Sequence, residues 1–138
     1  GPLGSGYAAK LINNLIVGGE ITLIAEAFGL ARRAGVDLTR LMEALSGGAA
    51  ASPVLTMKGS KMISGDYTAS SRVLIHLKDQ HNAQEMARAL GADIPACDLS
   101  TLLLEKLADM GRGNEDVAAV IDLFQSKVDL RRLWNGNL

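Results

Sequence analysis

Cysteine, proline and aromatic residues are scarce in this 138-residue chain, and each scarcity excludes a class of protein. The one cysteine, Cys97, allows no intrachain disulfide and favours a reducing compartment, so we expect a cytoplasmic protein in which Cys97 is a buried structural thiol. Aromatic residues make up only 4% of the chain, which disfavours β-sandwiches. Abundant alanine and leucine, with only three prolines, instead favour an all-α fold.

The chain also carries no excess of positive or negative charge. The chain has 14 basic and 15 acidic side chains and a formal net charge of -1, which gives no electrostatic basis for binding nucleic acid or an anionic membrane surface. No uninterrupted apolar run approaches the roughly 20 residues that span a bilayer, because glycines and glutamates interrupt the longest candidate, 15–30. We therefore predict neither a nucleic-acid partner nor a membrane location.

The length fits one domain with a hydrophobic core. Residues 1–5 read like the remnant of a cleaved expression tag, so we expect a helical domain over 6–127 and a tail over 128–138. A first helix over about 6–34 is apolar on more than one face and should be buried nearly all round, with small residues where other helices approach. Start and stop signals predict a fold of six or seven helices. After the first helix, we expect helices over 38–45, 53 to 59 or 63, 71–90, 95–110 and 114–127. The tail would form the seventh.

Lys10 and Asn14 follow Gly6 and are four residues apart, so they lie on one face of the first helix, one turn apart. An ammonium beside a carboxamide suits binding a small hydroxy acid and moving a proton on or off its hydroxyl group. Spacing alone, however, favours a simpler interpretation, a solvated first turn on a buried helix.

Lys78 and Asp79 lie on the predicted helix over 71–90. Taken alone, this pair is typical of the solvated edge of an amphipathic helix. His76 and His81 fall on different faces of the same helix, with neither cysteine nor suitably spaced carboxylates beside them. We therefore predict no metal site, and we interpret His76 as a core or edge residue.

Five short motifs occur in order along the chain, and each of them is weak alone. They are Gly6 with Lys10-x-x-Asn13-Asn14, Glu26-Ala27 with Ala34-Gly35-Val36-Asp37, Ser46-Gly47-Gly48-Ala49, Lys78-Asp79, and Asn114-Glu115-Asp116-Val117. Together they resemble the β-hydroxyacid dehydrogenases, which include 3-hydroxyisobutyrate, tartronate semialdehyde and L-threonate dehydrogenases, with 6-phosphogluconate dehydrogenase as a distant relative. The resemblance covers nearly the whole chain but only the C-terminal helical domain of that family.

The resemblance implies oxidation of a small 3-hydroxy acid with NAD or NADP as cofactor. In that family, the lysine that matches Lys10 takes the hydroxyl proton, and the amide that matches Asn14 binds the substrate. The residues that match Lys78 and Asp79 lie near the cofactor. The family's N-terminal Rossmann domain, which holds most of the dinucleotide, has no counterpart in this sequence, so we expect the fragment alone to be inactive.

Two other classes of function stay open. The apolar first helix and its small residues also suit a non-catalytic helical oligomerisation or interaction module, although the retained Lys10 favours an enzyme. A small-molecule-binding regulatory domain is the third possibility. We also expect a homo-oligomer, a dimer or larger, because about 100 further residues cannot easily cover a long helix that is apolar on most faces.

Overall fold

The computed structural model describes residues 4–126 and 130 and confirms the all-α prediction for them. Its elements are α1 (Ser5–Arg33), α2 (Leu38–Ser46), the π-helical turn η1 (Leu55–Gly59), α3 (Ser60–Ser64), α4 (Val73–Leu90), α5 (Pro95–Asp109), the 3-10 turn η2 (Val117–Val120) and α6 (Ile121–Gln125). This described part has no strand, only an isolated bridge between Arg72 and Asp116. The predicted tail lies outside it, apart from Leu130, which packs against the core.

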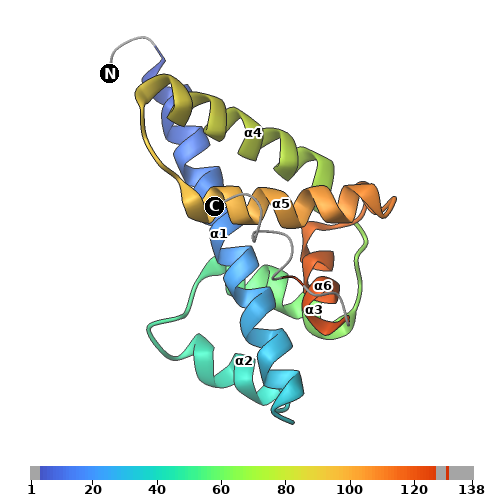
Figure 1. Cartoon of the computed structure of the whole chain (residues 1–138). Coiled ribbons are helices and arrows are strands. Elements are labelled where there is room, and N and C mark those ends of the chain that lie inside the picture. The colour runs from blue at the N-terminus through green and yellow to red at the C-terminus, as the bar shows by residue number, and fades with distance from the viewer. Residues whose placement is uncertain (1–3, 127–129, 131–138) are drawn as a thin grey trace.

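The helix α1 runs the length of the molecule, with α4, α5 and α6 packed against it and α2 near its C-terminal end (Figure 1). Its buried face, which includes Ile21, Ala25 and Phe28, meets α4, α5 and α6. The opposite face stays open, and the prediction that this helix is buried nearly all round is therefore wrong. The exposed fractions of four large apolar side chains show this: 51% for Ile12, 56% for Ile16, 67% for Leu23 and 69% for Leu30.

Two glycines of α1 lie where neighbouring elements come close, as predicted. A Cβ atom on Gly18 would lie 1.8 Å from the Gln80 side chain of α4, and one on Gly29 would lie 2.7 Å from the Cβ of Phe124 in α6. Gly19, by contrast, has nothing within 4 Å of the corresponding position. The absence of a side chain therefore allows close packing at Gly18 and Gly29, whereas Gly19 belongs to the exposed face.

The middle of the chain follows the predicted order of helices, with one local departure. Asp37 caps α2, since its side chain accepts a hydrogen bond from the Arg40 amide at 2.9 Å. The helical segment that begins at Pro53 runs through to Ser64, but its centre, η1, is π-helical. Single π turns often mark functional or strained positions, and this one carries Lys58 toward the interior, where the residue is only 4% exposed.

The predicted last helix over 114–127 begins later than expected, at η2. Residues 113–117 instead pair with 67–74 through backbone hydrogen bonds, such as Asp116 to Tyr67 and Val73 to Glu115. Asp116 then caps η2 by accepting a hydrogen bond from the Ala118 amide at 3.1 Å. This pairing fixes the segment that leads into α4. The last described helix, α6, ends at Gln125, one residue before the end of the described range 4–126.

By length and mean hydropathy, α1 would be able to cross a membrane. Core helices of globular proteins meet the same criterion. Here the buried side of α1 packs on α4, α5 and α6, as a core helix does.

Candidate functional site

Two of the predicted site residues meet across the seam between α1 and α4. The side-chain amide of Asn14 donates a hydrogen bond of 2.8 Å to the Asp79 carboxylate, and both side chains are half-buried. The two residues are 65 positions apart in the sequence, so the fold itself brings them together. The Asn14 carbonyl oxygen accepts a hydrogen bond of 3.3 Å from the Asn13 side-chain amide. Its second lone pair can accept a hydrogen bond from a bound hydroxyl group.

The two predicted lysines flank this pair and are both exposed. Lys10 is one turn before Asn14 on α1, and Lys78 directly precedes Asp79 on α4. Within residues 4–126 and 130, neither ammonium has a hydrogen-bond or ion-pair partner. The seam therefore presents the Lys10 ammonium, an amide and a carboxylate. Lys78 lies about 100° further round α4 from Asp79, and both exposed cations remain available to an anionic molecule.

A buried polar cluster under the seam holds α4 against α1 and α5. Gln80, only 2% exposed, accepts a hydrogen bond from the Cys97 thiol at 2.7 Å and donates one to Ser100 at 3.4 Å. Ser100 in turn donates to the Gly18 carbonyl oxygen at 3.3 Å and accepts from Thr22 at 3.1 Å. Cys97 is thus the buried structural thiol that the sequence predicts, and burial raises its pKa. The cluster fixes Gln80, and with it the adjacent Asp79.

A buried ion pair between Lys58 and Asp116, which the sequence does not predict, lies beside the start of α4. The Lys58 ammonium lies 2.9 and 3.0 Å from the two carboxylate oxygens, and Asp116 has no exposed surface. The same carboxylate accepts hydrogen bonds from the Ser70 amide and hydroxyl and from the Ser71 amide. Burial alone would raise the pKa of Asp116, but the Lys58 ammonium and the Ala118 and Ser70 donors lower it to about 2.

The only local signal for this pair is that Asp116 precedes an unbroken apolar run over 117–121, as a capping residue does. Lys58 gives no comparable signal, because nothing in its neighbourhood indicates a partner 58 positions away. The pair holds the Ser70–Ser71 segment, from which α4 begins.

His76, in the first turn of α4, bonds to Ser71 at 2.5 Å between Nε2 and Oγ. His76 is thus a half-buried edge residue, as predicted, and its Nε2 has a partner. Burial and then the positive charge of Lys58 lower the pKa of His76, against the opposing charges of Asp79 and Asp116. His81 instead pairs with Glu105 at 3.0 Å on the surface. No group of three or more potential metal ligands occurs in the described residues.

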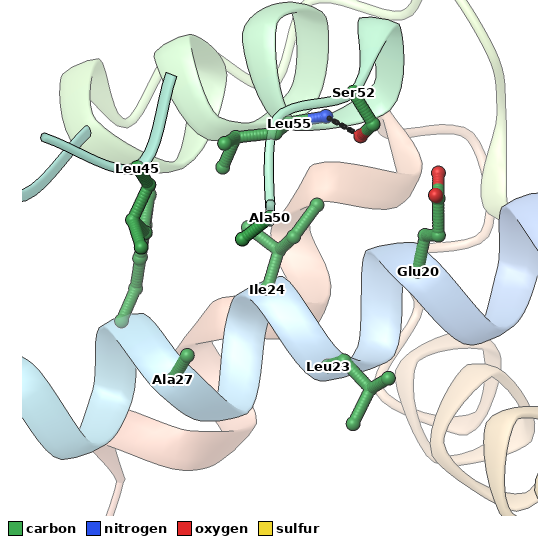
Figure 2. A pocket seen from close by; sticks show the side chains of 9 residues that line it. Glu20, Leu23, Ile24, Ala27, Leu45, Ala50, Ser52 and Leu55 are labelled. Atoms are coloured by element: carbon green, nitrogen blue, oxygen red, sulfur yellow. Dashed lines mark hydrogen bonds between the residues drawn. The ribbon is translucent and has the colours of Figure 1, made fainter. Parts of the chain in front are cut away.

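A separate hollow of about 280 Å³ lies between α1 and the segment that joins α2 to η1. Its walls are almost wholly apolar, and Ile24 and Ala27 of α1 face Leu45 and Leu55 across it (Figure 2). None of the four predicted site residues lines it, but it adjoins Leu23 of the exposed face of α1. This hollow suits apolar contacts and offers no acid–base chemistry.

Comparison with known proteins places this helical arrangement in a group of enzymes. The sequence profile described as "NAD-binding of NADP-dependent 3-hydroxyisobutyrate dehydrogenase" matches residues 4–124. A solved structure, 3-hydroxyisobutyrate dehydrogenase from Salmonella typhimurium, superposes with a TM-score of 0.84 at 32% identity, covering 87% of this chain and 42% of that one.

Curated relatives agree with that match. The chain is 30% identical over 122 residues to 2-hydroxy-3-oxopropionate reductase of Escherichia coli strain K12, covering 88% of this chain and 42% of the relative. It is 32% identical over 121 residues to L-threonate dehydrogenase of the same strain, covering 88% and 40%. The chain therefore spans about two fifths of the length of these relatives.

Proposed function

Because this chain belongs to the NAD-binding family of NADP-dependent 3-hydroxyisobutyrate dehydrogenase, we propose that it is the helical part of a dehydrogenase that oxidises the hydroxyl group of a small 3-hydroxy acid. The observation that carries the proposal is the bond between Asn14 and Asp79. It joins the two helices on which all four predicted site residues lie, so that Lys10 and Asn14 of α1 and Lys78 and Asp79 of α4 share one seam.

Lys10 is the acid–base residue in this proposal. In its neutral amine form, Lys10 takes the proton of the substrate hydroxyl while the C–H bond on the same carbon gives up a hydride and a carbonyl group forms. Lys10 is one turn from Asn14 and has no partner in the described residues, so its amine is available to the substrate. In the reverse reaction, Lys10 returns the proton to the carbonyl oxygen.

Asn14 is the substrate-binding residue, and Asp79 positions it. The carboxylate holds the amide nitrogen at 2.8 Å and so fixes the Asn14 side chain one turn from Lys10. The carbonyl oxygen of Asn14 accepts from Asn13 at 3.3 Å and keeps a second lone pair for the substrate. The substrate hydroxyl can then donate its hydrogen to the Lys10 amine or to the Asn14 carbonyl oxygen, while the other of these two groups orients the substrate. A preorganised pair of this kind lowers the entropic cost of reaching the reactive geometry.

The cofactor that the family implies is NAD or NADP, and the exposed cation of Lys78 fits one edge of its site. An unpaired ammonium beside the seam suits the negative charge of a dinucleotide phosphate. When bound, the nicotinamide accepts the hydride from the substrate. Lys78 and Asp79 would then lie at the cofactor side of the seam, and Lys10 and Asn14 at the substrate side.

In the family, most of the dinucleotide site belongs to a Rossmann domain, and this chain spans only about two fifths of the relatives' length. The isolated chain should therefore bind the cofactor poorly and show no useful turnover. Activity should require the full-length parent, and a cytoplasmic location fits the single buried thiol.

The exposed face of α1 supports a homo-oligomer, a dimer or larger. Ile12, Ile16, Leu23 and Leu30 lie within about 40° of one line along the helix, nearly opposite Lys10 and Asn14. A domain that covers the catalytic seam cannot also cover the far side of the same helix. We therefore expect a second copy of the chain to cover the exposed apolar face of α1. The apolar hollow beside Leu23 extends this surface.

The same exposed face also favours a second candidate function, a non-catalytic interaction module. The two candidates differ in what they require of Lys10, because a module needs only the apolar face and an enzyme needs the amine.

The test is oxidation of a panel of hydroxy acids, with NAD and with NADP, by the full-length parent and by this chain alone. The proposal predicts turnover by the parent and none by the isolated chain. A folded, oligomeric parent that oxidises no member of the panel with either cofactor contradicts the dehydrogenase and favours the module.

A further inference from the structure

We propose that Ser71 and His76 form a hydrogen-bonding subsite for a second hydroxyl group of the substrate, so that the preferred substrate is a polyhydroxylated acid. This inference rests on the proposed function and refines its substrate class. It concerns two residues that the motifs of the sequence left without a role.

The geometry leaves one nitrogen of His76 free for a ligand. Nε2 bonds to Ser71 Oγ at 2.5 Å, and among the described residues the ring makes no other hydrogen bond. No buried side-chain nitrogen or oxygen in that part of the chain lacks a partner, so Nδ1 must open to solvent. The ring is half-buried, which restricts its rotation while that one nitrogen stays accessible.

His76 lies one helical turn from the Asn14–Asp79 contact. His76 is three residues before Asp79, so the two side chains share one face of α4 and lie a single turn apart. Asp79 in turn bonds to Asn14. The Asn14–Asp79 pair therefore lies one turn from Lys10 on α1 and one turn from His76 on α4.

Ser71 is held firmly enough to orient the ring. Its amide donates to the Asp116 carboxylate at 3.1 Å, and its carbonyl oxygen accepts from the Val117 amide at 2.9 Å. Asp116 is itself fixed by the buried ammonium of Lys58. The ion pair thus acts through Ser71 as a positioning device for His76.

The charge state of His76 selects the kind of group it binds. Burial and the nearby Lys58 ammonium lower its pKa, so the ring is neutral at pH 7. A neutral imidazole exchanges a single hydrogen bond with a hydroxyl group and gains little from a carboxylate. A substrate with a methyl group at this place would leave Nδ1 without a partner, and sites built to bond a hydroxyl discriminate strongly against such analogues.

The test compares two substrates in the full-length parent. L-Threonate carries two hydroxyl groups beyond the one that is oxidised, whereas 3-hydroxyisobutyrate carries a methyl group and none. Wild type should prefer L-threonate by kcat/KM. His76→Leu should lower kcat/KM for L-threonate by at least about tenfold and change that for 3-hydroxyisobutyrate by less than about threefold.

Four further variants separate recognition from folding. His76→Asn places an amide near the position of Nδ1 and should retain much of the preference, whereas His76→Gln places it near Nε2 and should not. His81→Leu removes the exposed histidine of the same helix and should behave as wild type. Ser71→Ala should weaken the preference by releasing the ring.

The results that would overturn the subsite differ from the results that would overturn the proposed function. A wild type that prefers 3-hydroxyisobutyrate overturns the subsite, as does an equal loss for both substrates in His76→Leu. A parent with no turnover of either substrate or of the wider panel overturns the dehydrogenase, and the subsite with it.

Discussion

Asn14 and Asp79 are joined by a 2.8 Å hydrogen bond between α1 and α4, although 65 positions separate them in the sequence. One partner is ionised, so the bond is stronger than one between neutral groups. It fixes the side chain next to Lys10 at the point where chemistry is proposed. The stability of the seam and the reactivity of Lys10 should therefore depend on the same contact.

The contact between Asn14 and Asp79 predicts a measurable coupling. Asn14→Ala and Asp79→Ala should each lower the free energy of unfolding by about 1 kcal/mol, and the double variant should reveal a coupling of similar size. Urea denaturation of the four proteins gives the cycle. Asn13 is the matched control, because it is exposed and bonds only to its neighbour Asn14. A coupling between Asn14 and Asp79 no larger than that between Asn13 and Asp79 would contradict the contact.

Adjacent glycines of α1 should respond in opposite ways to the same change. Gly18→Ala should lower the free energy of unfolding by about 1–3 kcal/mol, because the new methyl group would collide with the buried Gln80. Gly19→Ala has open space and should raise stability by up to about 1 kcal/mol, since alanine is the better helix former. Thermal denaturation monitored by circular dichroism checks both, and equal shifts in the two variants would refute the close approach.

The pair of Lys58 and Asp116 predicts a loss of stability in acid. The pKa of Asp116 falls from 3.8 to about 2 on folding, so the unfolded chain binds this proton more readily. The resulting stabilisation, about 2 kcal/mol, is complete above about pH 4 and is lost as the pH falls toward 2. Urea unfolding between pH 2 and 6 measures the slope, which Asp116→Asn should flatten and the exposed Asp109→Asn should leave unchanged.

Removing one partner of a buried ion pair costs about 3–5 kcal/mol, and Asp116→Asn is therefore at risk of not folding. The titration of the Asp116 carboxyl carbon by NMR in the wild type provides the same information. A midpoint near 3.8 instead of about 2 would show that the pair does not stabilise the fold in this way.

The exposed apolar face of α1 predicts assembly. Sedimentation velocity at micromolar concentration should show a dimer or larger species for the wild type and a monomer for Leu23→Glu, because a charge in the middle of the face opposes its burial. Leu90→Glu, at the end of α4, is the control, since Leu90 is 74% exposed but belongs to a different helix. A monomeric wild type well above nanomolar concentration would contradict the oligomer.

The sequence predicts most of the helices because their ends carry local signals. Asp37 caps α2 and Pro95 begins α5, and glycines follow α1 and α4 within two residues. The last helix begins later than predicted because Asp116 and its neighbours bond to residues 67–74, and local sequence does not report such distant pairing. The exposed face of α1 could not be predicted for a related reason. The apolar character of a helix does not show which of its faces the other helices cover.

The candidate site shows the same division. Lys10, Asn14, Lys78 and Asp79 can be named from motifs, but only the packing of α1 on α4 brings Asn14 to Asp79. Their catalytic and binding roles stay predictions. The ion pair of Lys58 and Asp116 could not be predicted, because the one local signal, Asp116 before an apolar run, indicates a helix cap and not a partner 58 positions away.

The most direct test of the account is the turnover number of Lys10→Ala in the full-length parent, with and without added primary amines. General acid–base catalysis by this lysine predicts a kcat lower by about 10²–10⁴-fold, a KM that changes little, and partial rescue that grows with amine concentration. Lys106→Ala, in the last turn of α5, serves as the control and should behave as wild type. Near-normal turnover by Lys10→Ala would contradict the assignment of Lys10 and the dehydrogenase mechanism built on it.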